Sequence, residues 1–204
     1  MNWQKYKVDI PEGQSGNWHI ERFEVSEEAA SLERLRSAFN PGRRMPVPVG
    51  QYTRLMYEAP NRMRTLVMSD TPAEISDHLE PIYRAKGQVL VNGLGLGVVV
   101  KAMLEKPEVK SLTVIEFSPD VIALVGDYYV AQYGDRLEIV NADAFTWQPP
   151  RGVRYTIVWH DIWNHICSDN LPEMHRLHRK YGRRTDWQGS WCRAECEYQR
   201  GFGY

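Results

Sequence analysis

The stretch VLVNGLGLGVVV, Val89 to Val100, is an apolar run that breaks into three glycines at alternate positions, Gly93, Gly95 and Gly97. Glycine adopts backbone conformations that other residues avoid, so the pattern predicts a buried strand, a tight turn and then a helix. Such a turn lets the backbone approach a ligand at the N-terminus of a helix. The same pattern is also compatible with a purely structural turn.

Two common nucleotide-binding motifs do not fit this turn. The dinucleotide fingerprint G-x-G-x-x-G would require a glycine at Val98, and a Walker loop would require G-K-[ST], whereas the first lysine after the glycines is Lys101. Val91 stands where many nucleotide-binding turns carry an acidic residue. The motif therefore favours neither a dinucleotide nor a nucleoside triphosphate.

Strand-like and helix-like segments alternate from Gly87 onward. The strand-like segments are QVLVN, SLTVIEF, RLEIVNAD and RYTIVWHD, and the helical ones include GVVVKAMLEK and SPDVIALVGDYYVAQYG. Short apolar strands separated by helices are typical of a parallel sheet that is covered on both faces. We therefore predict an α/β core with a doubly wound parallel sheet over residues 87–162.

The segments on either side of this core have a different character. Residues 1–86 predict an N-terminal extension, with a strand at 18–25, a helix from Ser26, a hairpin around Pro60-Asn61 and a lead-in helix capped by Ser69 or Asp70. Residues 163–204 predict one helix, NLPEMHRLHRKYG, and a tail rich in Trp and Arg without an apolar strand. On the first helix, one face carries Ala29, Leu32, Leu35 and Phe39.

Two carboxylates stand at the ends of predicted strands. Glu116 ends the second strand, about 20 residues after the glycines, where it can accept hydrogen bonds from two ribose hydroxyls. Asp143 ends the third strand, near the expected place of an adenine amino group. The alternatives are an exposed glutamate at a strand end and an aspartate that caps a short helix.

Taken together, VLVNGLGLG, KPEVKSLTVIEFSPDVIALVGDYY, DRLEIVNADAF and RYTIVWHD resemble the class I S-adenosylmethionine-dependent methyltransferase fold, and within it the spermidine synthase-like branch. The resemblance covers about residues 87–161 and implies a Rossmann-like methyltransferase sheet. Because the chain ends before the family's remaining strands, we expect the sheet to lack them. The resemblance implies cofactor contacts at Gly93, Gly95, Gly97, Glu116, Phe117, Asp143 and Ala144.

The segment after the fourth strand departs from the aminopropyltransferase pattern. In DIWN, Asp161 matches the first acidic residue of that signature, but Asn164 stands at the second and no proline follows. An apolar residue at Val91 is nevertheless common in the spermidine synthase-like branch.

The acceptor site is expected where the fourth strand ends beside the glycine turn, at the switch in strand order. A carboxylate there can orient an amine or accept its proton, so Asp161 is the catalytic candidate, with His160 beside it. Trp159, Trp163 and Asn164 are candidates for the wall of a substrate pocket. The alternative is that Trp159 packs in the core and Asp161 caps the next helix. Met68, Ser69 and Asp70 are candidates for closing over the cofactor.

Composition and charge restrict the class of partner. The 204 residues carry a formal net charge of −1, which predicts no general affinity for nucleic acid or acidic membranes. No apolar run is long enough for a membrane span, no signal peptide is recognisable, and three cysteines predict no disulfide framework. We therefore expect a cytoplasmic protein. The same composition is compatible with a homo-oligomer.

The tail contains a set of possible metal ligands, His175, His178, Cys192 and Cys196. The spacings H-x2-H and C-x3-C do not match the usual zinc spacings, so we predict no metal site. The basic run from Arg176 to Arg184 is more typical of a solvated helix face than of a nucleic-acid patch.

These observations predict an S-adenosylmethionine-dependent methyltransferase that acts on an amine, either a small molecule or a side chain, or on another small nucleophile. Two alternatives stay open: an aminopropyltransferase that uses the decarboxylated cofactor, and a module that binds the cofactor without catalysis.

Overall fold

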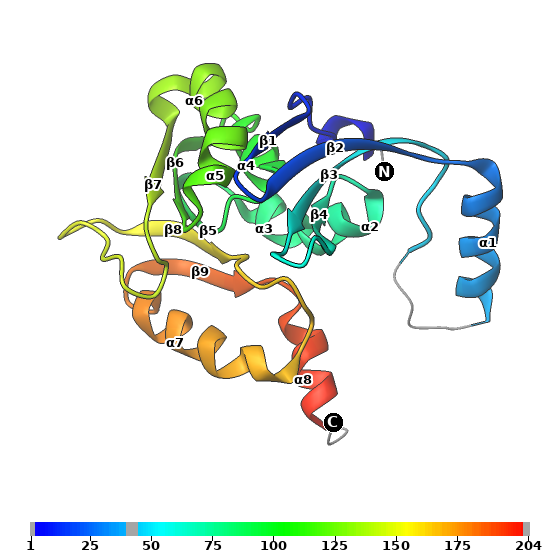
Figure 1. The fold of residues 1–204 in the computed structure, drawn as a ribbon. Coiled ribbons are helices and arrows are strands. Elements are labelled where there is room, and N and C mark those ends of the chain that lie inside the picture. Colours follow the sequence, from blue (N-terminus) through cyan, green and yellow to red (C-terminus); the bar gives the residue numbers. More distant parts are fainter. Residues whose placement is uncertain (1–2, 40–44, 202–204) are drawn as a thin grey trace.

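The computed structural model describes residues 3–39 and 45–201, which form two β-sheets (Figure 1). The first sheet is antiparallel, in the order β1-β2-β3-β4, and follows a short 3-10 helix, η1 (Trp3–Tyr6). The predicted strand at 18–25 and the predicted hairpin are both confirmed. The strands are β1 (Gly13–Ser15), β2 (Trp18–Val25), β3 (Gly50–Glu58) and β4 (Arg64–Ser69).

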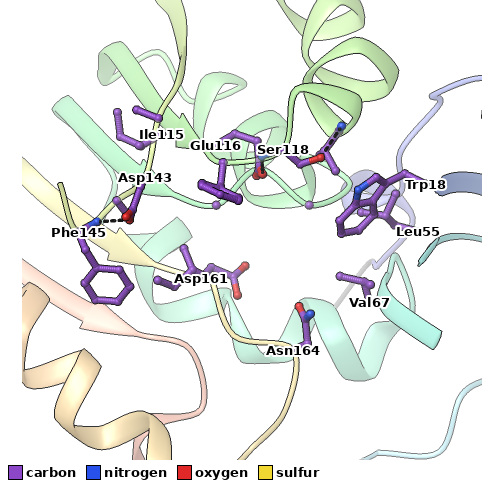
Figure 2. Close-up of a pocket in the computed structure, with 17 residues that line it drawn as sticks. Trp18, Leu55, Val67, Ile115, Glu116, Ser118, Asp143, Phe145, Asp161 and Asn164 are labelled. Carbon is purple, nitrogen blue, oxygen red and sulfur yellow. Dashed lines mark hydrogen bonds between the residues drawn. The ribbon is translucent and has the colours of Figure 1, made fainter. Parts of the chain in front are cut away.

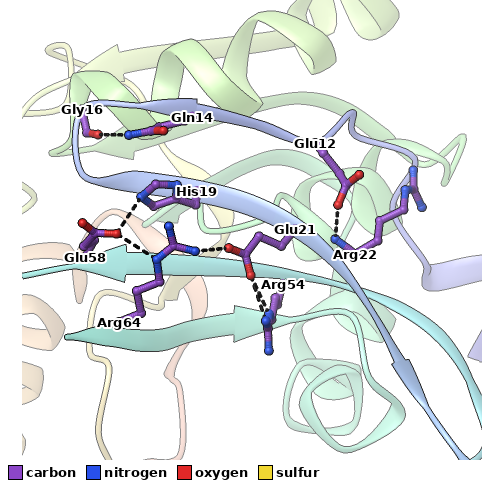
Figure 3. A network of polar contacts seen from close by, with 9 residues as sticks. All are labelled: Glu12, Gln14, Gly16, His19, Glu21, Arg22, Arg54, Glu58 and Arg64. Carbon is purple, nitrogen blue, oxygen red and sulfur yellow. Dashed lines mark hydrogen bonds and ion pairs between the residues drawn. The ribbon is translucent and has the colours of Figure 1, made fainter. Parts of the chain in front are cut away.

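A polar network covers one face of this antiparallel sheet (Figure 3). Glu21 on β2 pairs with Arg54 on β3 at 2.8 Å and with Arg64 on β4 at 2.5 Å. Arg64 also pairs with Glu58 at 2.8 Å, and His19 lies 3.6 Å from the same glutamate. Because side chains alternate along a strand, the opposite face is free to carry apolar residues toward the core.

Helix α1 (Glu27–Ala38) begins at the predicted cap, where the Ser26 side chain accepts a hydrogen bond from the backbone N–H of Ala29. The helix lies apart from both sheets (Figure 1). Its predicted apolar face does not pack against the core: Leu35 is 56% exposed and Phe39 is 82% exposed. The apolar residues of α1 therefore recur with the spacing of an amphipathic helix, but they are not buried as such residues usually are.

The lead-in helix is interrupted. It consists of α2 (Pro72–Asp77) and α3 (Leu79–Arg84), which meet at His78. The cap residue of α2 is Thr71, so the predicted cap Ser69 lies two residues too early and the predicted cap Asp70 lies one residue too early.

The second sheet is parallel throughout, in the order β7-β6-β5-β8-β9. The chain runs outward from β5 through β6 to β7 and then returns to β8 on the other side of β5. This order confirms the predicted doubly wound Rossmann-like fold and places a switch in strand order beside β5. The strands are β5 (Gly87–Asn92), β6 (Val109–Glu116), β7 (Leu137–Asn141), β8 (Tyr155–His160) and β9 (Thr185–Ser190).

Strand β9 contradicts the prediction that the tail holds no strand. It pairs with β8 from Tyr155↔Thr185 to His160↔Ser190. Its sequence, TDWQGS, lacks an apolar run because β9 is the outermost strand of the described sheet, and an edge strand needs less apolar surface than a central one. Trp187 of β9 stacks on Trp159 of β8, with ring centroids 6.3 Å apart.

Helices connect β5 to β6, β6 to β7 and β8 to β9 and cover the two faces of the parallel sheet, whereas a loop connects β7 to β8 (Figure 1). One hydrophobic core joins the N-terminal extension, the parallel sheet and the tail, with Leu55, Val91 and Met174 among its buried members. Among the described residues, no helix has both the length and the apolar character required to cross a membrane. The remaining helical segments are α4 (Val98–Leu104), α5 (Pro119–Val121), the π-helical η2 (Ile122–Gly126), α6 (Asp127–Tyr133), the 3-10 turns η3 (Gly134–Arg136) and η4 (Ser168–Asn170), α7 (Leu171–Tyr181) and α8 (Arg193–Gly201).

Candidate functional site

The three glycines after β5 have different structural roles. All have positive φ angles, 97° at Gly93, 53° at Gly95 and 71° at Gly97. A Cβ on Gly93 would lie 2.0 Å from the backbone oxygen of Asp161, and one on Gly97 would lie 2.1 Å from the ring of Tyr129. Gly93 and Gly95 border a pocket, whereas Gly97 packs against Tyr129 and begins α4. Gly97, a predicted cofactor residue, is thus absent from the lining of that pocket.

The pocket lies at the carboxyl ends of the parallel strands, where the switch in strand order predicts a ligand. It has a volume of about 470 Å³, which is in the range of small-molecule sites. One wall comes from the strand ends and the turns after them. The other comes from the antiparallel sheet, which contributes Trp18, Leu55 and Val67 (Figure 2).

Glu116 is positioned by two backbone donors at the end of β6. Its Oε2 accepts a hydrogen bond from the N–H of Leu94 in the glycine turn, and its Oε1 accepts one from the N–H of Ser118, both at 2.8 Å. Burial raises the pKa of this carboxyl group. A carboxylate offers about four lone-pair sites, so each oxygen still has capacity for a ligand hydroxyl.

The loop after β7 forms another part of the wall. This loop lines the pocket with Asp143, Ala144 and Phe145. The pocket is also lined by Phe117, which follows β6 and is 76% exposed. The Asp143 Oδ1 accepts a hydrogen bond from the Phe145 N–H at 2.7 Å. Asp143 therefore caps a turn at residues 144–146 and also lines the pocket, but the short helix that the sequence predicted after it does not form.

Asp161 follows β8 and lines the pocket beside Gly93. Burial, together with the nearby carboxylates of Glu74, Asp77 and Glu116, raises its pKa to about 8. Its Oδ2 lies 3.7 Å from Nε2 of the buried His78. A carboxyl group with a pKa near neutrality is suited to exchange protons with a ligand.

A small recess of about 40 Å³ adjoins the pocket and shares four lining residues with it, Val67, Gly95, Asp161 and Asn164. Trp163, Trp191 and Glu74 complete much of its wall. Two of the three predicted substrate-pocket residues, Trp163 and Asn164, are therefore beside Asp161. The recess combines carboxylates with indole rings, a chemistry that favours a cation.

His160 and Trp159 do not line the pocket or the recess. His160 is fully buried, and its Nδ1 lies 2.7 Å from Nδ2 of Asn92. Burial and the neighbouring His178 lower the pKa of His160 to about 3, so the ring is neutral at ordinary pH. Trp159 is buried on the opposite face of the sheet, with Trp187. Alternation along β8 directs both side chains to the two faces of the sheet rather than past its end.

The tail residues that resembled zinc ligands make other contacts. His178 Nε2 lies 2.9 Å from the Ser190 hydroxyl, and Nδ1 of the same ring lies 3.0 Å from the Arg193 guanidinium. His175 Nε2 lies 3.4 Å from the same guanidinium. Within residues 3–39 and 45–201, no group of three or more His, Cys, Asp or Glu side chains is arranged to hold a metal ion.

Sequence reasoning missed the contribution of the N-terminal extension to the site. Trp18, Leu55 and Val67 lie on three different strands and carry no motif that would associate them with the glycine turn. Of the candidates for closing over the cofactor, Met68 contacts the turn through Sδ, which accepts from the Leu96 N–H at 3.3 Å. Asp70 instead accepts backbone hydrogen bonds from Val8 and Thr53 inside the extension.

No family model matches this sequence, and no curated protein matches it either. Solved structures with a similar fold include the 23S rRNA methyltransferase ErmE, at 17% identity and a TM-score of 0.44, over 57% of this chain and 43% of that one. A dimethyladenosine transferase from Plasmodium falciparum has 18% identity and a TM-score of 0.41, over 53% and 37%. Phosphoethanolamine N-methyltransferase 1 from Haemonchus contortus, in complex with phosphoethanolamine and S-adenosylhomocysteine, has 15% identity and a TM-score of 0.40, over 54% and 24%. The chain thus spans less than two thirds of each of these structures, and the similarity concerns the fold alone.

Proposed function

We propose that this chain binds S-adenosylmethionine in the pocket and transfers the methyl group to an amine. The observation that carries the proposal is the arrangement of Glu116, whose two oxygens are each held by one backbone N–H, one from Leu94 between Gly93 and Gly95 and one from Ser118. A carboxylate fixed in this way has two remaining acceptor sites that suit the two hydroxyls of a ribose. Asp143, across the pocket, is available to an adenine amino group.

The glycine turn supports the fit of this cofactor. A Cβ on Gly93 would collide with the backbone of Asp161, and one on Gly95 would lie 2.5 Å from Met68 Sδ, so the turn beside the pocket packs more closely against these residues than side-chain-bearing residues would allow. When bound, the cofactor supplies an electrophilic methyl group on a sulfonium sulfur. The residues of the chain then have to bind, orient and deprotonate the acceptor.

The recess supports an amine as the acceptor. An ammonium group there would face the carboxyl groups of Asp161 and Glu74 and the rings of Trp163 and Trp191. An amine attacks only when unprotonated, so a neighbouring group must take its proton. The positive charge of the ammonium group favours the ionised form of Asp161. In that form Asp161, with its pKa raised to about 8, accepts a proton from the ammonium group at a smaller free-energy cost than an ordinary aspartate. The small volume of the recess suits the reacting tip of an acceptor.

Calorimetric titration tests the proposal. We expect S-adenosylmethionine and S-adenosylhomocysteine to bind, and NAD not to bind. Ligand at 100 times its dissociation constant should stabilise the fold by about 2.7 kcal/mol, which a thermal shift measures independently. Preference for decarboxylated S-adenosylmethionine would replace methyl transfer by aminopropyl transfer. Absence of binding by all three adenosyl-sulfur ligands would overturn the proposal.

A further inference from the structure

Three of the charged residues of helix α7, Glu173, Arg176 and Lys180, stand at spacings of three and four. Residues at these spacings lie on one side of an α-helix. The adjoining side packs into the core through Met174, Leu177 and other buried residues, which anchors the helix. The buried side therefore holds α7 in a fixed position, from which the charged side chains reach their partners.

At the C-terminal end of α7, Lys180 holds the loop after β7. Its ammonium group donates to the backbone oxygen of Ala144 at 2.8 Å and to that of Trp147. Partial burial of the ammonium group lowers the pKa of Lys180. Hydrogen bonds from a charged donor are stronger than those from a neutral one, so these two contacts restrain the loop firmly.

One turn earlier, Arg176 contacts the same loop. Its guanidinium carbon lies 5.0 Å from the centre of the Phe145 ring, a cation–π geometry. Phe145 lines the pocket, and its backbone N–H donates to Asp143 (Figure 2). Two cations of α7 thus contact the loop that is expected to meet the adenine ring.

At the N-terminal end of α7, Glu173 reaches the other side of the site. Its Oε2 accepts a hydrogen bond from the indole N–H of Trp163 at 2.8 Å. Trp163 lines the recess beside Asp161. The same side of one helix therefore contacts both the loop after β7 and the wall of the recess.

We propose that Glu173, Arg176 and Lys180 are positioning residues, through which α7 sets the distance between the adenine side of the pocket and the acceptor recess. The inference rests on the proposed function for the identity of the ligands, but not for the restraint of the loop. The basic character of α7 is then explained by its role inside the molecule, without a nucleic-acid partner.

Hydrogen exchange in the ligand-free protein tests the restraint of the loop. Lys180→Met removes the ammonium group and keeps the length of the side chain, and we expect about tenfold faster exchange of amides 144–147, equivalent to roughly 1.4 kcal/mol. Lys180→Arg should restore most of the protection. The matched control is Arg179→Met, which removes an exposed cation from the same helix and should change nothing in the loop. Unchanged exchange in Lys180→Met would overturn the inference, whatever the protein binds.

Ligand discrimination tests the positioning role. We expect Lys180→Met to weaken S-adenosylhomocysteine about tenfold and to lower the preference for it over S-inosylhomocysteine, in which an oxygen replaces the adenine amino group. Glu173→Gln should leave this preference unchanged and should speed the exchange of amides 162–164 instead. An unchanged preference in Lys180→Met would overturn the positioning role. If the wild-type protein binds neither nucleoside, the proposed function fails, and the hydrogen-exchange result alone decides the inference.

Discussion

The two sides of the pocket are built in different ways. The side proposed for the cofactor (the cofactor side) is made by turns that follow consecutive parallel strands, so Gly93, Glu116 and Asp143 meet at one edge of the sheet because of the strand order alone. The side proposed for the acceptor (the acceptor side) is made by side chains from distant segments, including Glu74 of α2 and Trp191 after β9. The first side depends on backbone geometry and the second on tertiary packing. Substitutions should therefore affect them differently.

The largest effect is expected at the glycine turn. Gly93→Ala places a Cβ at a φ of 97° and 2.0 Å from the backbone oxygen of Asp161, so we expect a loss of about 3 kcal/mol in the free energy of unfolding and no measurable binding of S-adenosylhomocysteine. Urea denaturation and calorimetry measure the two effects. The matched control is Gly152→Ala, which has a φ of 83° and no atom within 4 Å of its Cβ, and should cost about 1 kcal/mol. Equal costs at the two positions would contradict the close approach.

A strong effect on binding is expected at Glu116. Glu116→Gln replaces one oxygen by an NH2 group that faces a backbone N–H, and removes the charge that attracts the ribose hydroxyls. We expect roughly 100-fold weaker binding of S-adenosylhomocysteine by calorimetry. The control is Glu138→Gln on the neighbouring strand, which lies outside the pocket and should bind as the wild type does. Binding within threefold of wild type would remove Glu116 from the site.

The same contrast explains what could be predicted from the sequence. Periodicity and glycine spacing predicted the first four strands of the parallel sheet, and the parallel order then placed Glu116 and Asp143 at the pocket. Strand β9 was missed because its stability comes from pairing with β8 and from the contact between Trp187 and Trp159, which no local pattern encodes. Helix α1 shows the reverse, because its apolar period gives no indication of whether a partner surface covers Leu35.

The acceptor side shows the same limit. Asp161 was predicted at the pocket because the end of β8 is set by the sheet. His160 was grouped with it by proximity in sequence, although adjacent residues of a strand point to opposite faces. Glu74 and His78 approach Asp161 only because α2 and α3 pack there, which the sequence pattern does not reveal.

A moderate, pH-dependent effect is expected at Asp161. Folded Asp161 keeps its proton up to a pH of about 8, whereas the unfolded chain releases it near 3.8, so this group makes the fold progressively less stable as the pH rises between these values. Asp161→Asn should therefore raise the melting temperature relative to wild type more at pH 8 than at pH 5. It should spare S-adenosylhomocysteine binding and lower turnover of an amine acceptor. Asp169→Asn, at an exposed position, is the control, and equal gains at both pH values would contradict the raised pKa.

The smallest effect on binding is expected at His160, which lies next to Asp161 in sequence but is buried on the far side of β8. His160→Gln should bind S-adenosylhomocysteine within twofold of wild type, while the loss of the contact with Asn92 lowers the free energy of unfolding by about 1 kcal/mol. The pKa of the folded His160 is about 3, so in wild type the unfolded state takes up a proton as the pH falls below 6.5, and stability is lost in that direction. The variant should lose less stability between pH 6.5 and pH 4, although His178, with a folded pKa of about 4, retains part of the slope. A large loss of ligand affinity in His160→Gln would mean that the region behind β8 is coupled to the cofactor side, and the contrast between the two sides of the pocket would not hold.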